Sequence, residues 1–96
     1  MSKRDKRLEE WKSNPKPVTN WGTVESDLIY YGFEIDKSGG GSHFQISHHL
    51  LIDQGGYGAN GEFTIAVKNG RTIKRWALAD IVQAIELIER KQNETE

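Results

Sequence analysis

Three segments in which apolar and polar residues alternate lie between two segments whose apolar residues recur every three to four positions. The alternating segments are residues 33–36, 42–48 and 62–68, and a period of two predicts strands with one buried face. The flanking segments, residues 20–31 and 74–90, each carry one apolar stripe and predict amphipathic helices. Thr19 or Asn20 can cap the start of the first helix, and Gly32 can end it in a left-handed conformation. This order predicts an α+β two-layer sandwich, in which both helices cover one face of a three-stranded antiparallel sheet and the other face stays open.

The first 16 residues predict a leader helix that precedes this domain. Leu8 and Trp11 are its large apolar residues, and the prolines at positions 15 and 17 end it, because proline cannot continue a helix. With 96 residues the chain has the size of a single compact domain. The predicted organisation is a leader helix over residues 1–16, a domain over residues 17–91 and a flexible polar tail over residues 92–96.

The composition excludes several classes of protein. The chain has no cysteine, which rules out disulfides and thiolate metal sites. No apolar run approaches the roughly 20 residues of a membrane-spanning helix, and the basic start is not followed by a signal-peptide stretch. We therefore expect a cytoplasmic protein that does not engage a membrane.

Basic residues gather at one place although the net charge is only −1. Residues 17–67 carry one Lys or Arg against six Asp or Glu, whereas residues 68–75 carry four basic residues and no acid. Those four, Lys68, Arg71, Lys74 and Arg75, surround an Asn-Gly turn signal and lead into the start of the last helix, where free backbone N–H groups favour an anion. The cluster predicts phosphate binding, and a solvated charged turn is the alternative interpretation.

A histidine lies beside the glycine-rich segment that precedes the second predicted strand. The alternation puts Phe44 and Ile46 on the core side and His43 with Gln45 on the open side. Imidazole accepts and donates protons near neutral pH, and RNA cleavage needs both transfers. The backbone of Gly41 and Ser42 can offer N–H groups to an anion. Taken alone, the pattern also fits an ordinary surface histidine.

Other aromatic and histidine residues have simpler interpretations. His48 and His49 would supply three imidazoles with His43, but an extended strand spreads these side chains too far apart for one ion, so we expect no metal site. His48 is instead expected to cap or pad the end of its strand. Trp11 and Trp76 can stack on bases, yet we interpret both as packing residues.

The motif Gly40-Gly41-Ser42-His43, with Phe44 and Ile46 after it, resembles that of the HicA family of toxins. The resemblance includes Gly32-Phe33 before the first strand and Phe63-Thr64-Ile65 ahead of Asn69-Gly70, and it extends over about residues 18–88. It implies a double-stranded-RNA-binding-domain-like fold in the order α-β-β-β-α, and cleavage of messenger RNA that depends on His43. It also implies activity without a metal or cofactor, and a HicB-like antitoxin that covers the active face.

One position departs from the family pattern, since Lys68 stands where relatives often have a second histidine. A lysine there favours contact with a phosphate over proton transfer. Beside the enzyme hypothesis we therefore keep a non-catalytic module of the same fold that binds RNA or an antitoxin. The residues expected at the RNA are Gly41, Ser42, Gln45, Lys68, Arg71, Lys74 and Arg75, with Thr64 adding a polar group on the open face.

Overall fold

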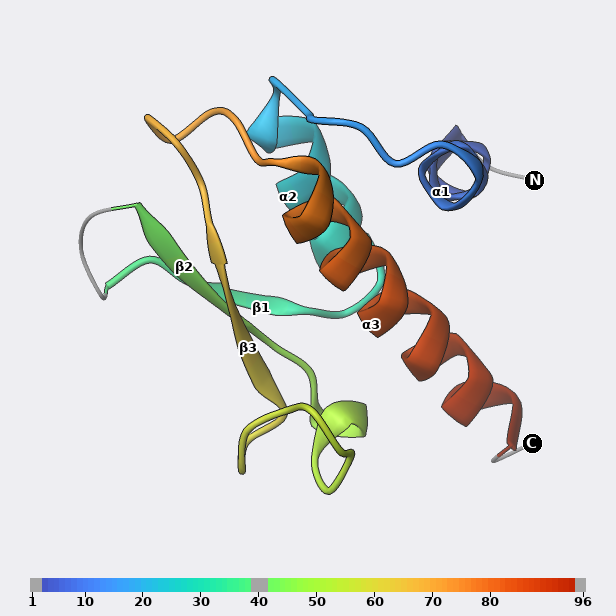
Figure 1. The fold of residues 1–96 in the computed structure, drawn as a ribbon. Helices are drawn as coiled ribbons and strands as arrows, with labels where there is room; N and C mark the ends of the chain where they lie inside the picture. The colour runs from blue at the N-terminus through green and yellow to red at the C-terminus, as the bar shows by residue number, and fades with distance from the viewer. Residues whose placement is uncertain (1–2, 39–41, 95–96) are drawn as a thin grey trace.

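The computed structural model describes residues 3–38 and 42–94. Its elements, in chain order, are α1 (Lys3–Ser13), α2 (Trp21–Tyr30), β1 (Glu34–Asp36), β2 (His43–Ser47), the 3-10 turn η1 (His49–Leu51), β3 (Glu62–Ala66) and α3 (Arg75–Glu94). The strands form one layer and the helices lie on one side of it, as Figure 1 shows. The predicted α+β sandwich with a three-stranded antiparallel sheet is therefore confirmed.

The sheet has the strand order β1-β2-β3, with both neighbouring pairs antiparallel. Its strands are slightly shorter than the alternation predicted, because β2 begins at His43 and β3 ends at Ala66. Pairing nevertheless continues past β3, where the Val67 N–H donates to the Ser42 carbonyl over 2.6 Å. Lys68 and Thr72 then form a β-bridge that closes a hairpin.

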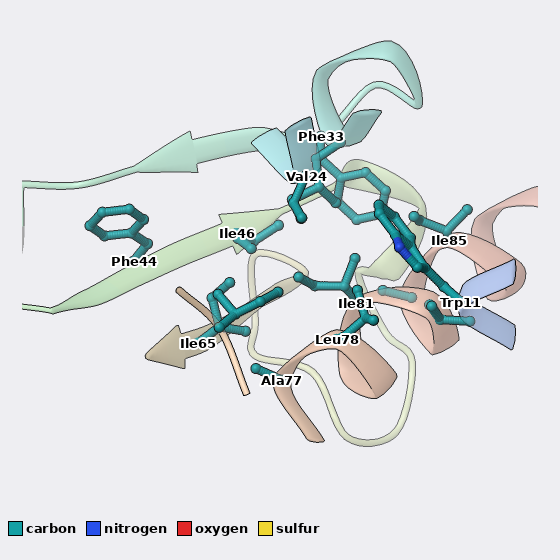
Figure 2. Packing of buried hydrophobic residues seen from close by; sticks show 14 of the residues in the cluster. Trp11, Val24, Phe33, Phe44, Ile46, Ile65, Ala77, Leu78, Ile81 and Ile85 are labelled. Atoms are coloured by element: carbon teal, nitrogen blue, oxygen red, sulfur yellow. The ribbon is translucent and has the colours of Figure 1, made fainter. Parts of the chain in front are cut away.

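The core lies between the sheet and the helices. Figure 2 shows Ile46 and Ile65 of the sheet directed toward Leu78 and Ile81 of α3. The buried apolar residues of the sheet and its extensions are Phe33, Phe44, Ile46, Ile65 and Val67, and those of α3 are Ala77, Leu78, Ile81, Val82, Ala84, Ile85 and Ile88. Every second strand residue therefore faces the helices, and the residues between them form an open face.

The leader helix α1 packs on the helical layer instead of standing apart. Leu8 and Trp11 are buried in the common core. Arg7 makes a two-pronged ion pair with Asp27 of α2, from Nε to Oδ2 over 2.6 Å and from Nη2 to Oδ1 over 2.7 Å. Because the Asp27 carboxylate is buried, this pair is costly to break and fixes α1 against α2.

The helix ends differ in part from the prediction. Asn20 precedes α2 but its side chain makes no capping hydrogen bond; instead the Trp21 N–H donates to the Arg71 carbonyl over 2.7 Å. A distant backbone group thus replaces the side-chain cap expected from the sequence. Gly32 has a φ of +94° after α2, as its expected role in ending the helix requires. α3 continues to Glu94, beyond the expected end at residue 90.

His48 caps the turn that follows β2, as expected. Its Nδ1 accepts a hydrogen bond from the Leu50 N–H over 3.1 Å, and its ring packs edge-on against Phe33 with the centroids 4.9 Å apart. Burial lowers the pKa of His48 below 6.5, and the neighbouring His49 lowers it further, while a hydrogen bond with the Tyr31 backbone opposes the shift. The neutral imidazole is therefore the form that fits the folded protein.

The lowered pKa predicts a loss of stability in mild acid. Below pH 6.5 the unfolded chain takes up a proton at His48 before the folded chain does, so the free energy of unfolding falls until the folded pKa is reached. Urea denaturation at several pH values down to about pH 5 measures this slope. His48→Asn keeps a hydrogen-bond acceptor for the Leu50 N–H and should flatten the dependence of the free energy of unfolding on pH in this range. An equal slope in both proteins would contradict its assignment to His48.

Candidate active site on the open sheet face

His43 is the first residue of β2 and its side chain is exposed on the open face. It lines a shallow pocket of about 300 Å³ with Asp36, Ser38, Gln45 and Thr64. All three strands or their ends contribute to this pocket, so the imidazole stands among polar groups that a substrate can reach. The expected orientation of His43 and Gln45, away from the core, is confirmed.

The strand registers arrange the open face in rows. Asp36, Gln45 and Thr64 are cross-strand partners in the middle row, and Glu34, Ser47 and Glu62 form the row at one end. His43 pairs with Ala66 in the row at the other end, and exposed Lys68 follows two positions later. We call these two ends of the face the acidic end and the histidine end.

Asp36 is a site residue that no motif or charge cluster of the sequence marks. Its Oδ1 accepts hydrogen bonds from the Ser38 N–H over 2.8 Å and from the Ser38 hydroxyl over 2.5 Å. These bonds lower the pKa of Asp36, so the group is a carboxylate at neutral pH. Its polar position within the 33–36 alternation placed it on the open face, but only the register with Gln45 brings it beside His43.

The basic cluster forms around a tight hairpin. Asn69 and Gly70 have φ values of +54° and +68°, and the Arg71 N–H donates to the Lys68 carbonyl over 3.0 Å, which confirms the predicted turn. Lys68 and Lys74 line one pocket of about 330 Å³ together with Ser42. Arg71 and Arg75 are exposed but do not line this pocket.

The expected RNA-contacting residues therefore fall into separate groups. Ser42, Lys68 and Lys74 line the pocket at the hairpin, whereas His43 and Gln45 line the neighbouring pocket on the sheet. Gly41 lies outside the described residues, so its expected contact with an anion is not placed. Lys74 precedes α3, whose first turn contains no acidic residue, and the helix dipole there adds to the local positive potential.

Of Trp11 and Trp76, both interpreted as packing residues, only Trp11 is buried. Trp11 is buried, in agreement with a packing role, and so is Trp21 of α2. Trp76 exposes 62% of its surface, so the packing role expected for it is wrong. It is the second residue of α3 and lies on the side of the helix away from the buried stripe. That stripe begins one residue later, at Ala77.

The three histidines do not converge. His43 is exposed on the open face, whereas His48 is buried and stacks on His49 with centroids 4.7 Å apart. Within residues 3–38 and 42–94, no three His, Asp or Glu side chains gather closely enough to hold a metal ion.

Comparison of the chain with protein-family models, with curated proteins and with solved structures found no match. Among the helices of the described residues, none has the length and apolar character needed to cross a membrane.

Proposed function

We propose that this protein is a metal-independent endoribonuclease that cleaves messenger RNA, the toxin of a HicA-type toxin–antitoxin pair. The observation that carries the proposal is the position of His43, an exposed imidazole at the start of β2 in a polar pocket of the open face. The resemblance around Gly41-Ser42-His43 supports the same role. Such a substrate places the activity in the cytoplasm.

Strand cleavage by the 2′-hydroxyl needs one proton removed from that hydroxyl and one delivered to the leaving 5′-oxygen. His43 supplies one of these transfers. Asp36 is the other ionisable side chain of the pocket, and it lies diagonally across the β1–β2 pair from His43, a relation that spans roughly 7–8 Å. A phosphodiester between the two side chains would have an acceptor on one side and a donor on the other.

The charge distribution favours RNA at the histidine end of the face. Glu34 and Glu62 at the acidic end repel phosphates, whereas Lys68 lies diagonally from His43 across the β2–β3 pair. Lys68 therefore acts by electrostatic attraction at the position where HicA proteins often have a second histidine. RNA that crosses the sheet near His43 and Lys68 would keep its backbone away from the acidic end.

An antitoxin of the HicB type would inhibit this enzyme by covering the open face. His43 is exposed on that face and lines its pocket, so a protein bound there would block RNA.

Cleavage of a long single-stranded RNA in the presence of a chelator tests the proposed activity. We expect wild-type protein to give products with a 2′,3′-cyclic phosphate, or its hydrolysed form, and a 5′-hydroxyl, because the attacking group is the neighbouring hydroxyl. RNA that is bound but stays intact would favour the non-catalytic module instead, and cleavage that stops on addition of chelator would contradict the metal-independent mechanism.

Asp36→Asn should slow RNA cleavage by roughly 10- to 100-fold, because the substitution removes the carboxylate that accepts a proton in the proposed mechanism. The effect is at the low end for such groups because a carboxylate is a weak base. The measurement is the cleavage rate as a function of pH, in which the acidic limb that reports the carboxylate should disappear. Glu34→Gln makes the same change in charge on the same strand and face, at the acidic end, and should leave the rate within about twofold. Equal effects of both substitutions would show that only the charge of the face matters.

A further inference from the structure

The exposed indole of Trp76 has no role in the core. It is the second residue of α3, and the buried stripe of that helix starts at the next position. A tryptophan with 62% of its surface exposed leaves a large apolar area in contact with water. Lys74 Nζ lies over the ring, 5.0 Å from its centroid, in a cation–π contact.

A pocket of about 330 Å³ opens beside this ring. Its polar side chains are Ser42, Lys68, Asn69, Thr72 and Lys74, and Ala66 and Ala77 supply apolar wall. The volume is within the range of small-ligand sites, which begins at about 300 Å³. One aromatic ring, two ammonium groups, one amide and two hydroxyls are the groups that bind a nucleotide: the ring stacks on the base and the ammonium groups attract the phosphate.

The charge of its lining residues also distinguishes this pocket from other pockets on the surface. Four other pockets each contain at least one carboxylate, from Glu86, Asp80, Glu25 and Asp36. Among the residues that the structure describes, no acidic side chain lines the pocket at Trp76. An anionic ligand therefore meets attraction there without an opposing charge in the wall.

The pocket adjoins the site of cleavage proposed above. Ala66 lines it and is the cross-strand partner of His43, while Ser42 lines it and precedes His43 in the chain. A nucleotide in this pocket would thus be a neighbour of the one whose phosphate lies at His43. Its base must leave any helical stack to reach the indole, which requires unpaired RNA.

We infer that the pocket formed by Trp76, Lys74, Lys68 and Asn69 binds one unpaired nucleotide of the RNA, with its base stacked on Trp76. This inference rests on the proposed function and adds a preference for single-stranded substrate. The hairpin at residues 68–72 would then contact the RNA in two ways. Lys68 attracts a phosphate, and the side-chain amide of Asn69 can form a hydrogen bond with the edge of a base.

Tryptophan fluorescence tests the inference directly, because Trp11 and Trp21 are buried and Trp76 is exposed. The protein used is the full chain with His43→Ala, which should bind RNA without cleaving it, and the probe is a single-stranded RNA of about eight nucleotides. We expect saturable quenching of the emission, and weaker or no quenching by a duplex of the same sequence. Trp76→Phe in the same background should abolish the quenching.

Binding affinity, measured with a fluorescent label on the RNA, is a second test of the same pocket. Trp76→Ala should weaken binding of the single strand by about 5- to 100-fold and binding of the duplex far less. Tyr30→Ala, at an exposed aromatic residue of α2 outside the pocket, should leave both unchanged. Lys74→Gln should reduce the slope of log affinity against log salt by about 0.7.

The outcomes separate this inference from the proposed activity. If wild-type protein cleaves RNA and Trp76→Ala binds it equally well, the nucleotide pocket is overturned but the proposed ribonuclease activity is not. The exposed indole would then contact a protein partner instead. Quenching by single-stranded RNA in a wild-type protein that never cleaves would support the pocket and contradict the enzyme. Equal weakening of single strand and duplex by Trp76→Ala would overturn base stacking.

Discussion

His43→Ala should lower the rate of RNA cleavage by about 10²- to 10⁴-fold, the usual loss when a group that transfers protons is removed. The side chain is exposed at the start of β2, so its removal leaves no cavity and the fold should persist. The rate is measured on a long single-stranded RNA in chelator, with both proteins prepared in parallel. Circular dichroism and urea denaturation check that the variant is folded.

His49→Ala is the matched control, because it removes an exposed imidazole of the same chain outside the pocket of His43. We expect it to cleave RNA at the wild-type rate. His43→Ala should still bind RNA, since the basic side chains at the hairpin are unchanged. Equal rates for wild type and His43→Ala would show that the cleavage comes from another group or from a contaminant, and would remove the basis of the proposed function.

Gly61→Ala should lower the free energy of unfolding by on the order of 3 kcal/mol, the largest effect we expect from a change outside the core. Gly61 has a φ of +70°, which an L side chain rarely adopts. A Cβ at this position would also overlap the backbone oxygen of His48 and lie 3.0 Å from the Ile52 nitrogen. Neither neighbour is a flexible side-chain end, so the loop after β2 would have to move.

Two other glycines of the same loop serve as controls for Gly61. Gly56 has a φ of +93° but open space around it, so Gly56→Ala should cost about 1 kcal/mol, the strain alone. Gly55 has open space and no positive φ, and Gly55→Ala should change stability by less than about 0.5 kcal/mol. Urea denaturation of the three variants measures the series. Equal effects would mean that the loop relaxes freely around residue 61.

Much of the fold follows from local patterns. The two periodicities identified α2, the three strands and α3 in the correct order, and Asn69-Gly70 identified the hairpin. These signals are local, because a period of two or of 3.6 decides which side chains share a face. Where the prediction and the structure differ, as at the start of α2, the partner is distant in sequence: the Arg71 carbonyl caps a helix some fifty residues earlier.

The candidate site could be predicted only in part. The alternation placed His43 and Gln45 on the open face, and composition located the basic cluster. Which basic residues share a pocket depended on the hairpin and the start of α3, which bring Lys68 and Lys74 together and leave Arg71 and Arg75 outside this pocket. A linear cluster of charges does not contain this information, because a tight turn reverses the chain within it.

The sequence by itself determined the order of elements, the buried face of each and the place of His43 on the open face. Only the tertiary structure decided the strand register that sets Asp36 beside His43, the exposure of Trp76 and the packing of α1 through Arg7 and Asp27. The physical reason is that periodicity states which residues share a face, whereas register, exposure and ion pairs depend on which distant segment packs against that face.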